Sequence, residues 1–490
     1  MFAPYEIEYE GRRYFGNVSL REFHIFDYDG NAYLVDVESL TARPVSPRLA
    51  VMIGHAASAC GGLVPASVVE ALRGLKLIEG LDDDRPETPP EVAPGSEAKA
   101  APGKAEFPIA NMALFLAQEC NMRCVYCYGD GGGYAGEGLM SEETALRAVD
   151  WLMENSGSAP KVNIGFFGGE PLLNFTLMRK IVPYARQKAQ EKGKKLTFGM
   201  TTNGSLLSDE VITFIKDAEV QSLISFDGPP EVQNRQRPFK DGSGSYDRVH
   251  ANVQKLREAV PHLSARATVY GDADPCMIKE GMARAGFATC YLALASPVLL
   301  NAPGTGPAPD GQSETMTQRM LAYNRKEIDE LLAAIREKSI VKDSPPAMLS
   351  LMAEIISGQK RYYGCGVGKG MAAVSVTGDI YPCHRFAGLA DMRLGNVADY
   401  RAGKLNDYHR AVVDHLPECR GCWARYYCGG GCSYHNKATT GDMHRPDVLA
   451  CREKKAMFEG LIHVYCNLSE ADREYVKEIL KDLRQEDRRP

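Results

Sequence analysis

Short apolar runs alternate with amphipathic segments between residue 109 and about residue 295. Helical periodicity covers residues 141–155 and 177–191, and Ser141 followed by two glutamates is typical of a helix N-terminus. The strand-like runs cover residues 113–116, 162–167, 196–202, 222–226, 265–269 and 291–294. This order predicts an α/β domain over residues 109–300, built as a partial parallel (β/α)6 barrel whose chemistry lies in the loops at the carboxyl ends of its strands.

The chain before the barrel predicts a small domain over residues 1–85. Its expected elements are strands over residues 23–26 and 33–37, a hairpin turn at Asp29-Gly30, and helices over residues 48–57 and 65–75. Strands followed by short helices indicate a winged-helix-like domain. Residues 86–108 are rich in Pro, Ala, Glu and Gly, so we expect a flexible linker that makes the first domain a tethered module.

Three further parts are expected after the barrel. Residues 301–360 form a bridging region, residues 361–460 a cysteine-rich domain and residues 461–490 a charged C-terminal helix. Within the bridging region we expect a loop over residues 301–315 and helices over residues 316–338 and 347–356. No internal repeat is evident, and the apolar faces of these helices predict ordinary core packing.

Composition narrows the class of protein. The 490 residues include 44% hydrophobic and 24% charged residues, as in a soluble globular protein of several domains. A net charge of −6 argues against a nucleic-acid partner, and neither a membrane span nor a signal peptide is evident, so we expect a cytoplasmic protein. Fourteen cysteines with C-x2-C spacings in a reducing compartment indicate metal ligands.

The first cysteine group follows the first predicted barrel strand. Cys120, Cys124 and Cys127 have the spacing C-x3-C-x2-C, which lets three thiolates hold three corners of a cubane iron–sulfur cluster and leaves the fourth iron without a protein ligand. Part of a zinc site, or three unrelated core thiols, is the alternative. With Tyr126 before the third cysteine, the loop resembles the signature of the radical S-adenosylmethionine (SAM) enzymes. That resemblance implies a SAM-binding [4Fe-4S] cluster and a 5′-deoxyadenosyl radical.

Polar residues follow three further predicted strands. Gly168-Gly169-Glu170 ends the second strand, and the resemblance implies that this motif holds the SAM amino group. It also implies SAM contacts for Tyr126, Asn203, Ser225 and Arg266. Asp227 is the candidate catalytic residue, because it contacts either SAM or the substrate. Ordinary turn chemistry is the alternative at the Asn-Gly and Asp-Gly pairs.

The second cysteine group resembles the SPASM extension of radical SAM enzymes, which carries two auxiliary [4Fe-4S] clusters. The resemblance assigns Cys419, Cys422, Cys428 and Cys451 to the distal cluster and Cys365, Cys383 and Cys432 to the nearer one. The nearer cluster is one ligand short. Either Cys60, Cys276, Cys290 or Cys466 completes it, or its open iron binds a substrate thiolate. A tetrahedral zinc site is the alternative for the distal four.

These parts together resemble the peptide maturases that form thioether or related cross-links. Residues 1–85 would bind the leader of a ribosomally made precursor peptide as an added strand, since acidic residues outnumber basic ones there and disfavour DNA. We expect a carbon–sulfur cross-link, with flavodoxin or ferredoxin as electron donor. Carbon–carbon or carbon–oxygen cross-linking, epimerisation and formylglycine formation are alternatives. A non-catalytic iron–sulfur electron carrier is a further alternative, and it predicts no SAM cleavage.

Overall fold

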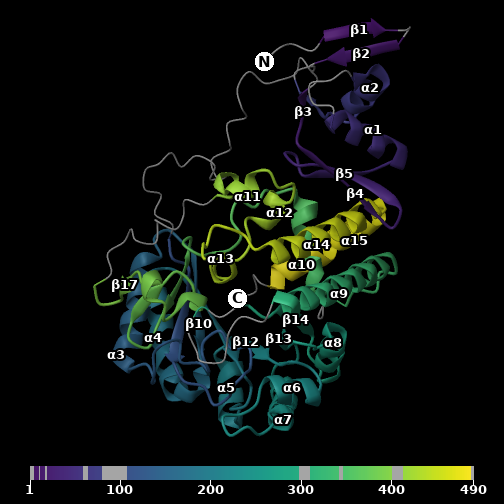
Figure 1. The fold of residues 1–490 in the computed structure, drawn as a ribbon. Coiled ribbons are helices and arrows are strands. Elements are labelled where there is room, and N and C mark those ends of the chain that lie inside the picture. The colour runs from purple at the N-terminus through teal and green to yellow at the C-terminus, as the bar shows by residue number, and fades with distance from the viewer. Residues whose placement is uncertain are drawn as a thin grey trace.

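The structure is a computed structural model that describes residues 5–9, 12–16, 19–58, 64–79, 108–296, 299, 310–341, 346–399 and 412–486. Figure 1 shows three parts. A small N-terminal unit (purple) lies on a group of long C-terminal helices (yellow and green), and a sheet wrapped by helices (blue and teal) lies on their other side. Almost all of the predicted linker, Cys60 and the first residues of the predicted loop after residue 300 lie outside the described residues.

A nine-stranded sheet forms the core of the largest part. Six of its strands run parallel, in the order β9 (Asn111–Ala117), β10 (Lys161–Gly168), β11 (Lys195–Thr202), β12 (Val220–Ser225), β13 (Ser264–Val269) and β14 (Thr289–Leu294). Each coincides with a strand-like run of the sequence, so the predicted parallel sheet is confirmed. Alternate side chains are buried under the helices, such as Ala265 and Ala267 on β13, while Arg266 between them points to the inner face.

Helices connect the strands and cover the outer face of the sheet (Figure 1). They are α3 (Glu142–Asn155), α4 (Phe175–Glu191), α5 (Asp209–Asp217), α6 (Pro230–Gln236), α7 (Tyr246–Ala259) and α8 (Pro275–Arg284). The side chain of Ser141 accepts a hydrogen bond from Thr144 N at 3.1 Å, which confirms the predicted helix start. The loops that lead from each strand into its helix therefore meet at one edge of the sheet.

Three strands from the cysteine-rich part extend the barrel sheet. β15 (Met371–Val374) pairs in parallel with β9, and β16 (Asp379–Tyr381) and β17 (Gly395–Asn396) continue in antiparallel order. Buried Gln118, just after β9, reinforces the junction by accepting a hydrogen bond from Val376 N at 3.1 Å. The sequence did not predict this pairing, because a strand's partner depends on contacts far along the chain.

The N-terminal unit contains small antiparallel sheets and two helices. Its elements are β1 (Tyr5–Tyr9), β2 (Arg12–Gly16), β3 (Ser19–Leu20), β4 (Phe23–Tyr28), β5 (Asn31–Asp36), β6 (Thr41–Val45), α1 (Pro47–Ser58), β7 (Val64–Pro65), α2 (Ala66–Gly74) and β8 (Ile78–Glu79). The predicted hairpin is confirmed: Asp29 and Gly30 both have positive φ, 55° and 73°, as a tight turn between β4 and β5 requires.

The N-terminal unit shares a buried core with the C-terminal helices. These helices are α9 (Asp310–Arg336), α10 (Ala347–Ser357), α14 (Val448–Cys466) and α15 (Glu470–Glu486). Tyr33 and Val35 of β5 belong to the same buried cluster as Leu331 of α9 and Leu461 of α14. The ring of His24 stacks on Trp423, with centroids 4.1 Å apart. The expectation of a freely tethered module is therefore wrong for β4–β6, since their apolar side chains pack in a core contributed by the far end of the chain.

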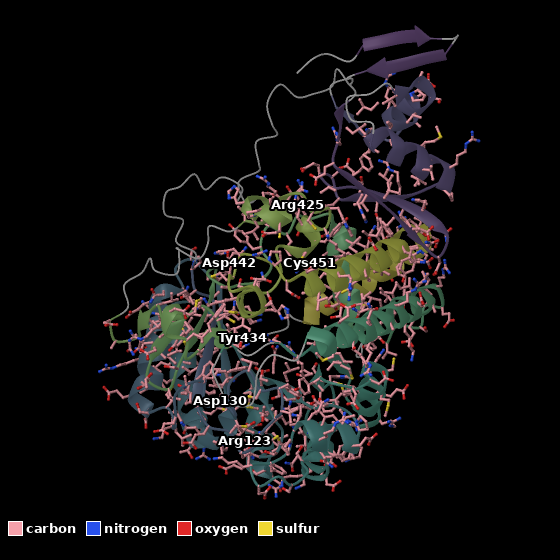
Figure 2. All side chains as sticks on the ribbon, viewed as in Figure 1. Arg123, Asp130, Arg425, Tyr434, Asp442 and Cys451 are labelled. Carbon is pink, nitrogen blue, oxygen red and sulfur yellow. The ribbon has the colours of Figure 1, made fainter. Side chains whose placement is uncertain are left out.

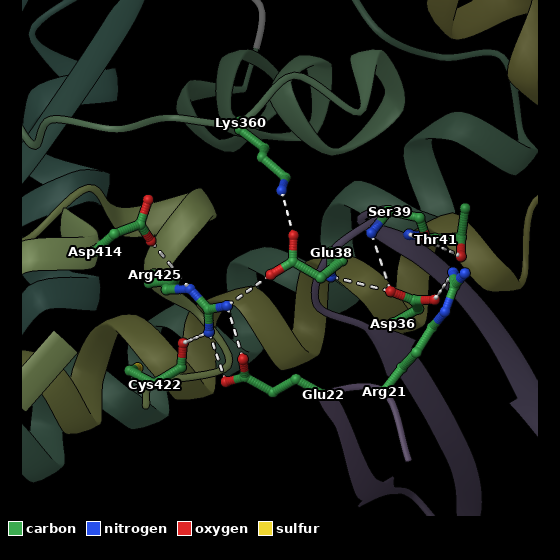
Figure 3. Close-up of polar contacts among 10 residues, drawn as sticks. All are labelled: Arg21, Glu22, Asp36, Glu38, Ser39, Thr41, Lys360, Asp414, Cys422 and Arg425. Carbon is green, nitrogen blue, oxygen red and sulfur yellow. Dashed lines mark hydrogen bonds and ion pairs between the residues drawn. The ribbon is translucent and has the colours of Figure 1, made fainter. Parts of the chain in front are cut away.

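A buried arginine anchors the N-terminal unit by charge (Figure 3). Arg425 opens the short helix α12 (Arg425–Cys428) and is only 5% exposed. Its Nη1 and Nη2 donate to the two carboxylate oxygens of Glu22 at 2.5 and 2.7 Å, and Nη2 also donates to Glu38 at 2.9 Å. Its Nε lies 3.4 Å from Asp414 Oδ1. Because both glutamates come from the N-terminal unit, this network fixes that unit to the cysteine-rich part.

Two helix boundaries differ from the sequence expectation. α9 begins at Asp310, so the predicted loop is wrong over residues 310–315. Glu314 in this added turn forms an ion pair with Arg452 of α14 at 2.6 Å, a contact that hydrophobic periodicity does not reveal. α14 also runs through residue 461, where we expected the C-terminal helix to start, and α15 begins only at Glu470. Among the described helices, none combines the length and the apolar composition needed to cross a membrane.

Candidate active site

The cysteine loop follows β9 and is held by a segment that follows α6. Three backbone hydrogen bonds join the two: Arg123 N to Pro238 O at 2.8 Å, Val125 N to Gln236 O at 3.0 Å, and Lys240 N to Asn121 O at 3.0 Å. Met122 and Phe239 form an antiparallel bridge between them. The loop is therefore fixed at the carboxyl edge of the sheet, where the sequence predicted the chemistry to lie.

Cys120, Cys124 and Cys127 share one local environment. Cys120 Sγ accepts hydrogen bonds from Met122 N at 3.4 Å and from Asn203 Nδ2 at 3.7 Å. The pKa of Cys124 is raised to about 12, chiefly by burial and in part by the neighbouring Cys127 and Cys120 thiols, while the charge of Arg237 acts to lower it. Buried thiols of this kind become thiolates when a metal centre replaces their protons.

The donor set fits three corners of an iron–sulfur cubane, because three thiols converge on one loop that already supplies hydrogen bonds to sulfur. Within the described ranges, no three His, Cys, Asp or Glu side chains are arranged to hold a single metal ion. The support for an iron–sulfur cluster at this loop is therefore the type of ligand, the spacing of the three cysteines and their place on one loop.

Gly168 and Gly169 pack against the cysteine loop itself. A Cβ on Gly168 would lie 2.1 Å from Ala117 O, and Gly168 also has a φ of 129°. A Cβ on Gly169 would lie 2.2 Å from Glu119 O. The backbone N of Gly169 donates to Ala117 O at 2.9 Å. The two glycines thus let β10 and the cysteine loop approach each other more closely than any side chain would permit.

The carboxylate of Glu170 is fully buried and holds neighbouring loops together. Its Oε1 accepts hydrogen bonds from Leu172 N at 3.0 Å and Thr202 Oγ1 at 2.8 Å, and its Oε2 accepts one from Asn203 N at 2.8 Å. Burial raises its pKa, while these donors counteract that effect. The carboxylate that we expected to face SAM therefore also positions Asn203, whose amide donates to Cys120 Sγ and to Asn121 Oδ1.

A second network joins Tyr126, Asp227 and Arg237. The Tyr126 hydroxyl donates to Asp227 Oδ2 at 2.5 Å and accepts from Arg237 Nη1 at 2.6 Å. Arg237 Nη1 lies 3.9 Å from Asp227 Oδ1, which also accepts from Thr268 N at 3.1 Å. Asp227 is fully buried and Arg237 is 7% exposed. Burial raises the pKa of Asp227, and the Arg237 charge opposes that rise.

Arg237 is a site residue that the sequence did not reveal. No sequence pattern separates it from Arg235, which lies two residues earlier, is exposed and pairs with Asp272 at 2.7 Å. The Nε of Arg237 is buried without a hydrogen-bond partner, and the charge of Arg237 lowers the pKa of the Cys124 thiol. Ser225 and Arg266, the other expected SAM contacts, lie opposite each other on β12 and β13. As SAM contacts, Tyr126, Asn203, Ser225 and Arg266 remain predictions.

The second cysteine group separates into two sets. The pKa of Cys419 is raised to about 12, chiefly by burial and in part by the thiols of Cys451, Cys428 and Cys422. The pKa of Cys383 is likewise raised to about 12, chiefly by burial and in part by the thiols of Cys432 and Cys365. The structure thus places together the same residues that the resemblance assigned to each auxiliary cluster. Ligation of metal by either set remains a prediction.

Three of the four cysteines considered as a further ligand lie elsewhere. Cys276 is on α8 near Asp274, Cys290 is on β14 near Lys279, and Cys466 ends α14 near Arg473. The fourth, Cys60, falls outside the described residues. The side chain next to Cys383 is that of His384, whose Nδ1 lies 3.6 Å from the Cys383 sulfur.

Comparison with known proteins agrees with this site. Residues 115–280 match the model of the radical SAM superfamily. A serine-type anaerobic sulfatase-maturating enzyme of Bacteroides thetaiotaomicron is 31% identical over 172 residues, which are 33% of this chain and 40% of that enzyme. The radical SAM cyclopropyl synthase TigE of Paramaledivibacter caminithermalis is 25% identical over 172 residues, 32% of this chain and 35% of the synthase. The chain thus spans less than half of the length of either relative.

The fold is similar to a solved structure over most of the chain. Native anSMEcpe with bound AdoMet and Cp18Cys peptide has a TM-score of 0.58 at 19% identity, covering 73% of this chain and 99% of that one. At this level of identity the likeness establishes the fold alone.

Proposed function

Because the chain carries a radical SAM domain, we propose that it is a peptide maturase that forms a thioether cross-link in a ribosomally made precursor peptide. The observation that carries the proposal is the set of three thiols on one loop at the carboxyl edge of the parallel sheet, beside buried Glu170 and Asn203. SAM, one SAM-binding cluster and two auxiliary clusters are the cofactors. The expected setting is the cytoplasm, with a flavodoxin or ferredoxin as electron donor.

The residues of the loop have separable roles in this proposal. Cys120, Cys124 and Cys127 would hold a [4Fe-4S] cluster, which, when bound, supplies the electron that cleaves SAM and so generates the hydrogen-abstracting 5′-deoxyadenosyl radical. Glu170 and Asn203 position Cys120, and Tyr126 fixes the turn between Cys124 and Cys127 through Asp227. Ser225 lies on the neighbouring strand, with its polar side chain available to SAM.

The cross-link balances without a further co-reactant. One carbon–hydrogen bond and one sulfur–hydrogen bond of the peptide break, and one carbon–sulfur bond forms. The hydrogen atom leaves in 5′-deoxyadenosine, the thiol proton goes to solvent, and one electron goes to an iron–sulfur acceptor. Cys365, Cys383 and Cys432 would hold that acceptor in the nearer auxiliary cluster, and Cys419, Cys422, Cys428 and Cys451 would hold the distal one.

The N-terminal unit is the proposed binding site for the leader of the precursor peptide. Its small antiparallel sheets can accept an added strand from an extended peptide. Arg425 and the shared core fix this unit against the cysteine-rich part, which in turn shares its sheet with the barrel. A leader bound to this unit would keep a constant position relative to the barrel. The core segment of the same precursor peptide would then lie near the site each time the leader binds.

A second function is favoured by one of the relatives. The 31% identity over 172 residues with a serine-type anaerobic sulfatase-maturating enzyme supports oxidation of a Cys or Ser residue to formylglycine in a protein target. Formylglycine formation would leave the N-terminal unit without a leader to bind. The presence of this unit therefore favours the cross-link. The two functions differ in product, because formylglycine is an aldehyde, whereas a thioether removes one alkylatable thiol and a pair of hydrogen atoms from the peptide.

The test begins with anaerobically reconstituted protein and its Cys120→Ala/Cys124→Ala/Cys127→Ala variant. We expect about twelve irons in the wild type and about eight in the variant, as three cubanes require, with SAM cleavage under dithionite only in the wild type. Cys276→Ala/Cys290→Ala is the matched control and should keep both. Unaltered cleavage in the triple variant would overturn the proposed radical chemistry. An aldehyde product from a co-expressed Cys-containing peptide would replace the thioether by formylglycine.

A further inference from the structure

Ser205 closes a ring of hydrogen bonds with two asparagines beside Cys120. Asn121 belongs to the cysteine loop, and Asn203 and Ser205 lie in the turn that follows β11. Asn121 Nδ2 donates to Ser205 Oγ at 2.8 Å, and Ser205 Oγ donates to Asn203 Oδ1 at 2.6 Å. Asn203 Nδ2 donates to Asn121 Oδ1 at 2.8 Å and so completes the ring. The ring therefore joins the turn after β11 to the residue next to Cys120.

One backbone group determines how the amide of Asn203 is oriented in this ring. Ser205 N donates to Asn203 Oδ1 at 2.9 Å, so this atom of the amide must be the oxygen. The other atom of the same amide is then the nitrogen, which lies 3.7 Å from Cys120 Sγ. The backbone of Asn203 is held as well, because its N donates to Glu170 Oε2 at 2.8 Å. The ring thus directs an N–H group, and not an oxygen, at the sulfur.

The ring uses the whole hydrogen-bonding capacity of the Asn203 side chain. An asparagine amide has two N–H donors and one oxygen with two lone pairs. The donors of Asn203 contact Asn121 Oδ1 and Cys120 Sγ, and its oxygen accepts from the N and the Oγ of Ser205. Asn203 and Ser205 are both buried. No donor or acceptor of this amide is therefore left for SAM, the contact that the family resemblance implies.

Cys120 is also held by the cysteine loop itself. Arg123, which marks this loop in the barrel part of Figure 2, donates from its Nη1 to Cys120 O at 3.0 Å and to Met122 O at 2.9 Å. Met122 N is a second donor to Cys120 Sγ, at 3.4 Å. One donor to the sulfur thus comes from the loop and the other from Asn203, and only the second depends on the ring.

We propose that Asn121, Asn203 and Ser205 hold one N–H donor on the sulfur of Cys120 and so raise the reduction potential of the cluster that this loop would bind. The inference rests on the proposed function, which places a [4Fe-4S] cluster at this loop. Hydrogen bonds to the sulfur ligands favour the reduced state of such a cluster, because that state has one more negative charge. A higher potential eases the reduction that must precede SAM cleavage. Asn203 and Ser205 are thus positioning residues that act through Cys120.

The experiment measures the potential in full-length, anaerobically reconstituted protein. The electron paramagnetic resonance signal that Cys120→Ala/Cys124→Ala/Cys127→Ala lacks is followed in a redox titration with dithionite and mediator dyes. Asn203→Leu removes the donor to the sulfur, so we expect the potential to fall by about 59 mV, a tenfold change for a one-electron couple. Ser205→Ala should give a smaller fall, because the backbone N at position 205 still orients the amide. Ser205→Thr restores the hydroxyl and should return the potential to that of wild type.

Asn252→Leu is the matched control. Asn252 Nδ2 donates to Gly204 O at 2.9 Å, so this change loosens the same turn from α7 without removing a member of the ring. The potential of this variant should equal that of wild type. The Kd for SAM, measured by equilibrium dialysis with radiolabelled SAM, should stay that of wild type in Asn203→Leu and Ser205→Ala, because both residues act on the cluster.

The outcomes separate this inference from the proposed function. A wild-type potential in Asn203→Leu and Ser205→Ala would overturn the inference, as would an equal fall in Asn252→Leu. A higher Kd for SAM in Asn203→Leu without a fall in potential would assign the amide to SAM. If Asn203→Leu does not fold, the comparison of Ser205→Ala with Ser205→Thr decides, and a loss of about four irons in Ser205→Ala would assign the ring to cluster assembly instead.

Two results concern the proposed function as well. Absence of this signal from the wild type would overturn both the inference and the proposed function, because the loop would then hold no cluster. The expected shifts in a protein that cleaves SAM but modifies no peptide would leave the inference standing and remove the maturase proposal.

Discussion

Arg237 and Arg425 are both buried arginines beside a cysteine set, yet their surroundings are opposite. Arg237 has one buried carboxylate 3.9 Å away and a phenol at 2.6 Å. The Nε of each arginine is buried without a hydrogen-bond partner, so the two differ in their charged neighbours. Arg425 faces three carboxylates, those of Glu22, Glu38 and Asp414, and donates two hydrogen bonds to the first. One arginine is matched by a single buried carboxylate, and the other faces more carboxylates than its own charge requires.

The difference separates a reaction site from a structural joint. Beside Arg237, thiolates would add negative charge, because the Cys124 thiol raises the pKa of Arg237. Beside Arg425, the negative charge comes from carboxylates that folding brings together, those of Glu22 and Glu38 in the N-terminal unit and that of Asp414. The contrast predicts that changes near Arg237 affect cofactor retention and chemistry, whereas changes near Arg425 affect stability and domain docking.

The largest effect is expected from Arg237→Gln. This change leaves buried Asp227 without its countercharge, and breaking a buried ion pair costs about 3–5 kcal/mol, which corresponds to a loss of at least about a hundredfold. We expect SAM cleavage under dithionite to fall by at least that factor and the iron content to fall by up to about four per chain. Arg235→Gln, two residues away and in an exposed pair with Asp272, is the control and should behave as wild type. Full iron content and full cleavage in Arg237→Gln would make the arginine a structural residue like Arg425.

A smaller effect is expected from Asp227→Asn. The amide keeps the shape and part of the hydrogen bonding to Tyr126 and Thr268 but removes the charge, and a charged hydrogen bond contributes about 1.5–3 kcal/mol. SAM cleavage should fall by about tenfold or more. The double variant with Arg237→Gln sharpens the comparison, since coupled residues should give a loss smaller than the product of the single losses. Independent losses would indicate that Arg237 acts on Cys124 without Asp227.

Arg425→Met should lower stability more than chemistry. Glu22, Glu38 and Asp414 are 36–49% exposed and can be hydrated after the change, so we expect the free energy of unfolding to fall by about 1–3 kcal/mol, below the cost of breaking a fully buried pair. Urea denaturation measures this loss, and SAM cleavage without peptide should stay near that of wild type. Arg445→Gln, in an exposed pair with Glu418 at 3.4 Å, serves as the control. A loss of iron in Arg425→Met would show that the joint also maintains the cysteine set next to it.

The smallest effect concerns how the stability of the protein depends on pH, through a contact between the N-terminal unit and α14. His463 of α14 is buried with its Nδ1 2.8 Å from the Tyr33 hydroxyl, and burial lowers its pKa below the usual value. The unfolded chain therefore binds more protons than the folded one below about pH 6.5, so stability should fall as the pH is lowered through that value. Thermal unfolding at pH 7.5 and pH 5.5 should show a smaller difference in His463→Gln than in wild type. His415 is exposed, so His415→Gln should keep the wild-type difference. An equal difference in all three proteins would show that His463 does not cause the pH dependence.

The sequence was most informative where one stretch of chain determines the outcome. The six parallel strands, the hairpin at Asp29-Gly30 and the start of α3 at Ser141 depend on local pattern, and the structure confirms each. The cysteine spacing likewise indicated the radical SAM superfamily, whose model matches residues 115–280. What the pattern did not reveal is set by distant partners. Glu22 and Glu38 look like ordinary surface acids until Arg425 meets them, and Arg237 gains its place only because its segment pairs with the cysteine loop.

The pairing of β15 with β9 limits how this protein can be divided. A fragment that ends at residue 300 would expose one edge of β9 over residues 111–114, on the strand that leads into Cys120. Unpaired edges of apolar strands recruit other chains, and Leu114, Phe115 and Leu116 on this strand are fully buried in the intact molecule. The matched family region, residues 115–280, would therefore lack the β15 partner of β9 if it were expressed by itself. Exchange of parts between such proteins would have to move the cysteine-rich extension together with the barrel that it completes.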